Sequence, residues 1–354
     1  MSTVLQTSES WPGLEGVKRL FIFGDSYCSV FKTPTNFSQE ISPSADNPFY
    51  TPYPGRTYAG EGQPNWVGHF ITKYAPGPRY DPSKKRQSKD YKKDPLLVYN
   101  YASGGDRVAG VAYQVQKLFL PHVGAKPRWA PWDERNSLFT MFVGINDCAS
   151  FFYPSGLQQS EGQPNVDPVA ARVDQFMELQ EELYAAGARN FVFFDLPPID
   201  QSPALGLITA PTVYEVASSK DLDPNHISPY QKWNQILLGR LETFKSSHPD
   251  ATVFLFSTHQ VFSDLLQNLE KYGFPTEDRH RKGGSVWVDH LHPTSRVHDI
   301  IARSLAEFLN GVGGVGGRDA EESLESEKVK KERSGVSKFF RSASLKMGLG
   351  GKDS

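Results

Sequence analysis

The chain alternates short apolar runs with longer segments in which apolar residues recur at helical spacing. Five runs have the length of buried strands: VKRLFIFG (17–24), LLVYNYA (96–102), SLFTMFVG (137–144), NFVFFDLP (190–197) and ATVFLFST (251–258). The segments with helical spacing are 106–120, 168–187, 228–247, 258–272 and 294–309. Strands that are apolar throughout and alternate with helices are typical of a parallel sheet covered on both faces. We therefore predict an α/β fold.

Three segments depart from this pattern. Residues 32–64 are rich in Pro, Gly, Ser and Tyr and lack periodicity, and residues 76–95 form a basic loop. Both lie between the first two predicted strands, where insertions overhang the strand ends. Beyond Asn310 the chain becomes glycine-rich and then highly charged. We predict a folded domain over 1–310 and a disordered tail over 311–354. Within that tail, VSKFFRSASLKMG is an alternative candidate for an amphipathic helix that touches a membrane.

Charge and composition narrow the possible partners. The chain has 38 Lys and Arg against 40 Asp and Glu, a net charge of −2, which gives no electrostatic case for binding nucleic acid. The expected partner is therefore a small or neutral molecule. Aromatic residues make up 12% of the chain, which suits either a sugar-like substrate or a well-packed core.

Targeting signals are scarce in the sequence. The N-terminal residues lack the basic and apolar regions of a secretory signal, and no run of about 18 apolar residues occurs. These features predict a cytoplasmic location. The sequon Asn36-Phe37-Ser38 leaves secretion open.

Chemically useful side chains follow three of the predicted strands and precede the last helix. In open α/β sheets, ligands bind at the carboxyl ends of the strands, so these segments are expected to meet there. They read Gly24-Asp25-Ser26, Ala102-Ser103-Gly104-Gly105-Asp106, Gly144-Ile145-Asn146-Asp147 and Asp289-His290-Leu291-His292-Pro293-Thr294.

These segments supply the groups that acyl transfer needs. Ser26 can act as nucleophile, His292 can take its proton, and Asp289, three residues before His292, can orient the imidazole. The expected oxyanion donors are the backbone N–H groups of Ser26 and Gly105 and the side-chain amide of Asn146. Because Gly104 and Gly105 are adjacent, the sequence does not decide which of the two supplies the backbone N–H.

Simpler interpretations remain for single motifs. Asp and Ser are ordinary turn residues, and we expect Asp25 and Asp147 to accept hydrogen bonds within their own loops. Asp289 with His290 and His292 can also form part of a metal site. Trp66 is either a stacking platform for a substrate or a core residue at a helix start.

The four segments in this order resemble the GDSL or SGNH hydrolase superfamily, across about residues 11–310. Tyr27 stands where the family motif has Leu. The stretches WPG (11–13), FGDSY (23–27), PNWVGHF (64–70), NYASGG (100–105) and VWVDHLHPT (286–294) further resemble the fungal acetylesterases of carbohydrate esterase family sixteen.

The resemblance implies a specific fold and reaction. The fold would be a three-layer α/β/α sandwich whose five parallel strands follow the order 2-1-3-4-5, without metal or organic cofactor. The triad would be Ser26, His292 and Asp289, with Gly105 and Asn146 as oxyanion donors. The expected substrate is a small-molecule ester, an acetylated sugar above all. A lipase or lysophospholipase and a catalytically silent carbohydrate-binding protein are the alternatives.

Two further features bear on the fold. An α/β-hydrolase would need Gly-x-Ser-x-Gly at its nucleophile, whereas Cys28 occupies the place of the second glycine. Cys28 and Cys148 each lie two residues after a proposed site residue, beyond the ends of two strands that the implied order makes neighbours. A disulfide between them and two buried free thiols both remain open.

Overall fold

The computed structural model describes residues 1–31, 42–150, 167–204 and 227–315. At its centre lies a sheet in the order β1-β6-β5-β4-β2-β3. The strands are β1 (Thr3–Gln6), β2 (Arg19–Gly24), β3 (Leu97–Asn100), β4 (Ser137–Phe142), β5 (Asn190–Phe194) and β6 (Thr252–Phe256). Strands β2 to β6 run parallel and coincide with the five apolar runs of the sequence, in the expected order.

The sixth strand corrects the prediction of a five-stranded sheet. β1 pairs antiparallel with β6, with Thr3 opposite Leu255. It forms one edge of the sheet, and its Val4 side chain is 42% exposed. A short, partly exposed edge strand needs no continuous apolar run, which is the pattern that marked the other five strands.

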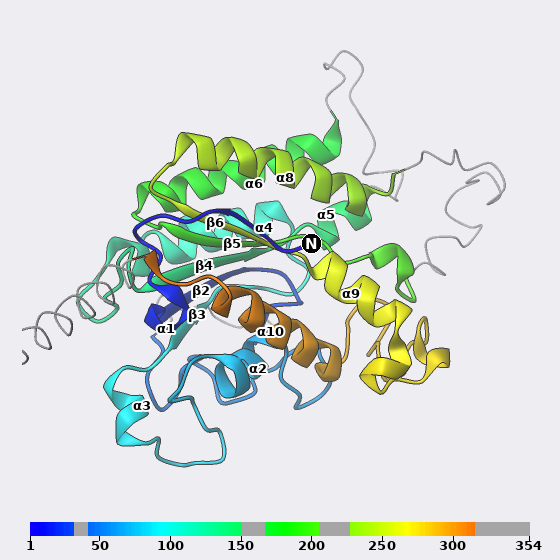
Figure 1. The fold of residues 1–354 in the computed structure, drawn as a ribbon, viewed down its shortest axis with the longest axis horizontal. Helices are drawn as coiled ribbons and strands as arrows, with labels where there is room; N and C mark the ends of the chain where they lie inside the picture. Colours follow the sequence, from blue (N-terminus) through cyan, green and yellow to red (C-terminus); the bar gives the residue numbers. More distant parts are fainter. Residues whose placement is uncertain (32–41, 151–166, 205–226, 316–354) are drawn as a thin grey trace, which may run out of the picture.

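Helices cover both faces of the sheet, as Figure 1 shows. One layer contains α4 (Val108–Tyr113), α5 (Ile145–Ser150), α6 (Pro168–Ala185) and α8 (Pro229–Ser247). The other contains α1 (Gly13–Gly16), α2 (Trp66–His69) and α10 (Ser295–Asn310), with α9 (Thr258–Gln267) packed beside α10. This arrangement confirms the predicted three-layer α/β/α architecture.

Local signals explain where the long helices begin. The Asp167 carboxylate accepts a hydrogen bond from the Val169 N–H at 3.0 Å, and Pro168 occupies the first turn of α6. α8 begins with a capping box in which Ser228 and Gln231 bond each other's backbone. The predicted loop over 76–95 contains one short helix, α3 (Lys89–Lys93), capped by Ser88.

Two predicted helices are regular for only part of their length. Segment 106–120 begins as α4 and continues as a π-helical turn over Gln114–Phe119, while 258–272 comprises α9 and a 3₁₀ turn over Leu269–Tyr272. A second π-helical turn, Phe70–Tyr74, continues α2.

Aromatic side chains fill much of the core. Phe21 of β2 stacks on Phe139 of β4 with ring centroids 4.6 Å apart and on Tyr99 of β3 at 5.0 Å. Phe142 and Phe194 stack in the same manner between β4 and β5, at 4.9 Å. Stacked rings on neighbouring strands bury large apolar surfaces, so this part of the aromatic content serves packing.

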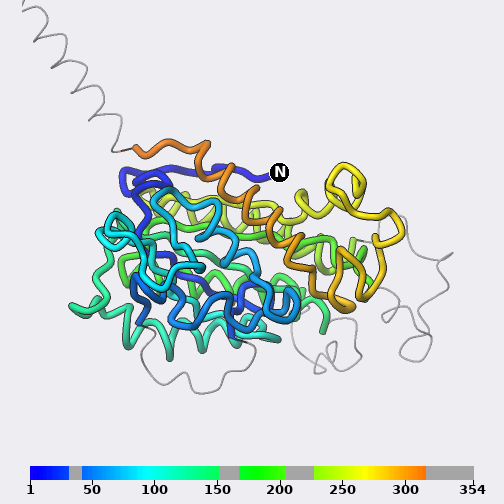
Figure 2. Tube along the Cα trace, turned by 90° about the horizontal axis from the view of Figure 1, so that it is seen from below, coloured from blue at the N-terminus to red at the C-terminus, as the bar shows by residue number. Residues whose placement is uncertain are grey.

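The two ends of the described chain lie together. In Figure 2 the orange segment after α10 runs beside the blue N-terminal segment. The Trp11 indole donates to the Val312 carbonyl at 3.0 Å, and the Val315 N–H donates to the Trp11 carbonyl at 3.1 Å. Residues 311–315 thus pack on the domain, which extends beyond the predicted boundary at 310. The rest of the predicted tail lies outside the described residues.

Candidate active site

The turn after β2 holds Ser26, a buried residue, at the carboxyl end of the strand. Gly24 has a φ of +157°, and a Cβ there would collide with the Phe142 carbonyl oxygen, so glycine suits this position. Asp25 then organises the turn: its carbonyl accepts from Cys28 and Ser29, and its carboxyl accepts from the Tyr27 N–H at 3.0 Å. Within the described ranges, the Ser26 N–H donates to no protein acceptor.

The structure brings Ser26, His292 and Asp289 into one hydrogen-bonded row. His292 Nε2 lies 2.9 Å from Ser26 Oγ, and His292 Nδ1 lies 2.8 Å from Asp289 Oδ2. The carboxylate can only accept, so Nδ1 carries the proton and Nε2 presents its lone pair to the Ser26 hydroxyl. This is the arrangement in which a serine hydroxyl can pass its proton to an imidazole.

Asp289 is held as a carboxylate by its own loop. Its Oδ1 accepts from the backbone N–H groups of Leu291 and His292, each at 2.8 Å. Partial burial raises the pKa of Asp289, but the hydrogen bonds from the His292 side chain and from these two N–H groups outweigh it. The net result is a pKa well below the ordinary value of 3.8. Asp289 therefore keeps the charge that orients the imidazole.

The glycine doublet forms a tight turn beside Ser26. The Asp106 N–H donates to the Ser103 carbonyl at 3.2 Å, and Gly105 has a φ of +84°, as the third residue of a type II turn requires. In the described part of the chain, the Gly105 N–H has no protein acceptor, and nothing lies within 4 Å of the place a Cβ would take. Gly104 differs, because a Cβ there would collide with the Tyr58 ring. The two glycines thus serve different needs.

Asn146 reaches the same edge of the sheet from the start of α5. Its Nδ2 donates to the Asp106 carbonyl at 2.9 Å, and the Asp25 carboxyl oxygen lies 3.4 Å away. The shorter bond uses one of the two amide hydrogens. The other hydrogen has only the long contact with Asp25, and this contact is the weaker of the two hydrogen bonds.

Three carboxyl groups lie beneath this site. Burial, reinforced by the neighbouring Asp147 and Asp106, raises the pKa of Asp25 to about 7, although the Tyr27 N–H opposes it. Burial likewise raises the pKa of Asp147 to about 6, and burial raises the pKa of Asp106. Asp147 accepts from the Val108 N–H at 3.2 Å, so it caps the first turn of α4.

Comparison with known proteins identifies the family. Residues 20–305 match the model of the GDSL-like Lipase/Acylhydrolase family, which is most of the chain. The chain belongs to this family. It is a carboxylic ester hydrolase, and the predicted GDSL relationship is confirmed.

Two curated proteins and one solved structure are among the proteins to which this chain is similar. An acetylesterase from Thermothelomyces thermophilus is 28% identical over 309 residues, which cover 83% of this chain and 89% of that protein. A phosphatidylcholine-sterol acyltransferase from Aeromonas hydrophila is 23% identical over 292 residues, 81% of this chain and 71% of that protein. The solved lipase/acylhydrolase from Enterococcus faecalis is 12% identical, with a TM-score of 0.39, covering 83% of this chain and 96% of that one.

Tyr27, which replaces the Leu of the family motif, has a role that sequence reasoning missed. Its hydroxyl donates to the Leu291 carbonyl at 2.9 Å, and its ring is fully buried. Burial raises the pKa of Tyr27 well above 10, so the phenol stays protonated as a donor. The bond ties the turn that carries Ser26 directly to the loop that carries His292. A Tyr beside Ser26 was visible in the sequence, but its distant acceptor was not.

Of the two interpretations of Trp66 that the sequence left open, the substrate-binding one does not hold in the structure. Its side chain is fully buried, packs on Phe194 with ring centroids 5.3 Å apart, and donates from its indole to Cys28 Sγ at 3.4 Å. No face of the ring is open for a sugar or acyl group, so Trp66 is a core residue at the start of α2. The first turn of that helix points its Trp into the interior because Asn65 caps the helix from within the core.

The two cysteines are free and buried. Cys28 Sγ faces the Trp66 indole, whereas Cys148 Sγ contacts the Pro229 carbonyl at 3.4 Å. The thiols thus pack against different elements. The sequence left a disulfide and two free thiols open, and the structure has two free thiols. Burial raises the pKa of both thiols well above 9, which makes them poor nucleophiles.

The geometry does not favour a metal at His292, because both of its ring nitrogens already have protein partners. His290 is exposed beside it. Within the described ranges, no three His, Cys, Asp or Glu side chains are grouped so as to hold a metal ion.

None of the helices described is long and apolar enough to cross a membrane.

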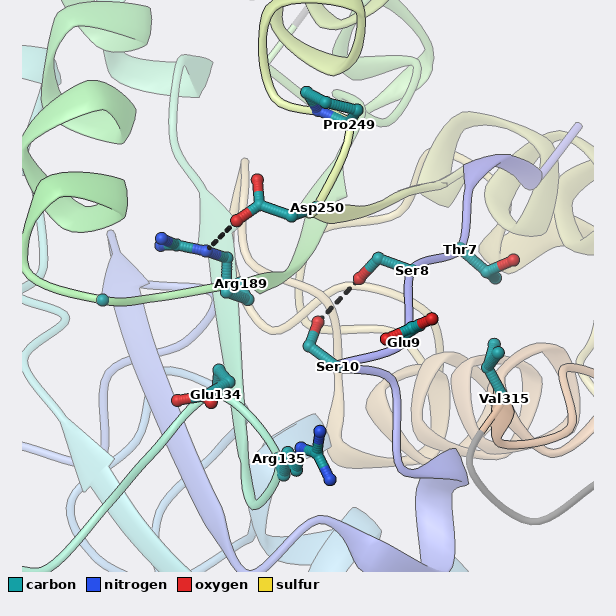
Figure 3. A pocket seen from close by; sticks show the side chains of 11 residues that line it. Thr7, Ser8, Glu9, Ser10, Glu134, Arg135, Arg189, Pro249, Asp250 and Val315 are labelled. Atoms are coloured by element: carbon teal, nitrogen blue, oxygen red, sulfur yellow. Dashed lines mark hydrogen bonds and ion pairs between the residues drawn. The ribbon is translucent and has the colours of Figure 1, made fainter. Parts of the chain in front are cut away.

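A cavity of about 880 Å³ lies away from Ser26, at the opposite ends of β5 and β6 (Figure 3). Its walls include the Arg189–Asp250 ion pair, 2.8 Å long, and Ser8 and Ser10, which bond each other at 2.7 Å. The Ser10 hydroxyl also donates to the Asn190 side chain at 3.0 Å. These contacts join the N-terminal segment to the sheet, which is a structural function.

Proposed function

We propose that this protein hydrolyses acetyl and other short-acyl esters, acetylated carbohydrates above all, through Ser26, His292 and Asp289. The observation that carries the proposal is the row of two hydrogen bonds through His292, 2.9 Å to Ser26 and 2.8 Å to Asp289. A serine hydroxyl paired with an oriented imidazole is the arrangement that activates a serine nucleophile.

The reaction proceeds in two steps. Ser26 Oγ bonds to the ester carbonyl carbon while His292 Nε2 takes the hydroxyl proton, and the carbonyl electron pair moves onto oxygen. Collapse of this intermediate breaks the bond to the alcohol oxygen, which leaves with the proton from His292. Water then repeats the sequence on the acyl-enzyme and releases the carboxylic acid and Ser26. Asp289 stabilises the imidazolium in both steps.

Three hydrogen-bond donors can serve the oxyanion. Two of them have no protein acceptor in the described part of the chain, and the third must first give up a contact with Asp25. The N–H groups of Ser26 and Gly105 lack protein acceptors in the described part, so a substrate oxygen is a natural partner. The Asn146 amide has one hydrogen on Asp106 and a long 3.4 Å contact with Asp25. An oxyanion would compete with Asp25 for that second hydrogen, and a protonated Asp25 would give it up more readily.

The acyl preference is supported by similarity. The similarity to the acetylesterase from Thermothelomyces thermophilus covers 83% of this chain, whereas the family as a whole also contains lipases. Lipid esters are the competing substrate class, favoured by the similarity to a phosphatidylcholine-sterol acyltransferase. Rates on p-nitrophenyl acetate and p-nitrophenyl palmitate separate the two classes, and faster turnover of the palmitate would overturn the short-acyl proposal.

Substitution of the nucleophile tests the mechanism. Ser26→Ala removes one oxygen from a turn that Asp25 holds together, so the fold and melting temperature should be retained. We expect kcat on p-nitrophenyl acetate to fall by at least about 10³-fold. A fluorophosphonate probe should label the native protein once, at Ser26, and leave Ser26→Ala unlabelled.

Ser263→Ala on α9 provides the matched control, because it removes the same atom from a serine outside the site. It should keep full activity and labelling. A folded Ser26→Ala protein with near-normal turnover would overturn the mechanism.

A further inference from the structure

Tyr58 lies across the catalytic centre, although no motif identifies it. Its ring stacks on the His292 imidazole, with centroids 4.7 Å apart and planes 28° apart. The phenol end rests on Gly104, where an added Cβ would come within 2.6 Å of Tyr58 Cε2 and collide with the hydroxyl oxygen. One side chain therefore spans from the proposed base to the turn that carries the Gly105 N–H.

The loop around Tyr58 is held on both sides. The Arg56 N–H donates to the Val30 carbonyl at 2.8 Å, and the Ser295 N–H at the start of α10 donates to the Ala59 carbonyl at 3.0 Å. Thr57 and Ala59 are buried, whereas Tyr58 between them is only partly exposed. Anchored flanks fix the direction of the ring, so Tyr58 is part of a preformed wall.

The orientation of the ring decides which part of an ester it faces. His292 exchanges protons in the plane of its imidazole, so the alcohol departs along that plane. Tyr58 covers the face of the imidazole and thus stands aside from the alcohol's path. Its other end lies on Gly104, the residue before Gly105, whose N–H would bind the carbonyl oxygen. The group beside that oxygen is the acyl substituent.

We propose that Tyr58 forms one wall of the acyl site and restricts the enzyme to short acyl groups. The proposal deepens the function proposed above and rests on it. By this proposal a longer acyl chain would collide with the ring, whereas an acetyl methyl would end beside it. Gly104 contributes to the same wall, because any side chain at this position would displace the Tyr58 ring. This explains why two glycines occur where the oxyanion turn itself requires one.

The test compares selectivity rather than rate. Values of kcat/KM are measured on p-nitrophenyl acetate, butyrate and octanoate for the native protein, Tyr58→Phe and Tyr58→Ala. We expect Tyr58→Ala to lower the acetate-to-octanoate ratio by about 10-fold or more, the effect of opening a pocket by a few carbon atoms. Tyr58→Phe keeps the ring and should keep the ratio.

Loss of the stack on His292 can slow all substrates alike, and the ratio does not register such a loss. Tyr113→Ala, a truncation of an exposed tyrosine at the end of α4, is the matched control and should leave the ratio unchanged. If Tyr58→Ala does not fold, Tyr58→Leu replaces it and should shift the ratio in the same direction.

Two results would overturn the proposal. One is an unchanged acetate-to-octanoate ratio in a folded Tyr58→Ala or Tyr58→Leu protein. The other is a shift confined to the alcohol, seen when acetates of p-nitrophenol, naphthol and glucose are compared. Failure of the proposed function would look different, because Ser26→Ala would then remain active.

Discussion

Asp25 offers a prediction that can be worked out in numbers. Burial, reinforced by Asp147 and Asp106, raises its pKa from 3.8 to about 7 in the folded protein. The folded state therefore binds a proton between these values that the unfolded state has lost. The contribution of protonated Asp25 to the free energy of unfolding is fully present below pH 3.8 and is lost as the pH rises through 7. Asp25→Asn removes this dependence because an amide does not ionise.

The size of the effect follows from the shift. One pKa unit corresponds to about 1.4 kcal/mol, so the full effect is about 4 kcal/mol. Between pH 8 and pH 5, linkage gives the native protein about 2 to 3 kcal/mol of additional unfolding free energy relative to Asp25→Asn. The variant keeps a side-chain oxygen that can accept from the Tyr27 N–H, so the turn itself should persist.

The assay is urea unfolding at pH 5 and pH 8, followed by tryptophan fluorescence and extrapolated to water. Only the difference between the two proteins is interpreted, because other groups also titrate. Burial lowers the pKa of His298 to about 3, so this group reduces the free energy of unfolding as the pH falls below 6.5. Burial raises the pKa of Asp147 to about 6, so this group increases the free energy of unfolding as the pH falls. His298 is present in both proteins and its contribution cancels to first order, whereas the coupling between Asp147 and Asp25 is part of the measured difference.

Parallel stability curves for the native protein and Asp25→Asn, agreeing within about 0.5 kcal/mol from pH 5 to 8, would refute the reasoning. They would mean that Asp25 ionises as freely in the folded state as in the unfolded chain, and hence that water reaches it. A matched change at an exposed carboxyl, Glu270→Gln, should give such parallel curves and serves as the control.

Two further substitutions test the links around the site. Tyr27→Phe removes the bond to the Leu291 carbonyl and should destabilise the fold by about 1 to 2 kcal/mol. It should also lower kcat more than it changes KM, since the His292 loop loses its tie to the nucleophile turn; an unchanged kcat in steady-state assays would contradict this role. Asn146→Ala should reduce kcat on the order of 10² to 10³ with KM nearly unchanged, if its amide binds the oxyanion. A change in KM alone would show that Asn146 only holds the Asp106 carbonyl.

The sequence by itself determined the parallel sheet and the set of polar groups at its carboxyl edge. Buried parallel strands are apolar along their whole length, so their pattern is visible without knowledge of any partner. Asp289 and His292 are only three residues apart, so their contact was also expected from the chain. Because the strand ends meet at one edge, Ser26 and Asn146 were expected nearby.

The tertiary structure decided the contacts between residues far apart in the chain. Tyr58 on His292, Tyr27 on Leu291 and the burial of Trp66 against Phe194 depend on how loops and helices pack on the sheet. The edge strand β1 likewise exists only because β6 offers it backbone partners. Local patterns report which side of an element is buried, whereas the identity of a long-range neighbour depends on the packing of the whole domain.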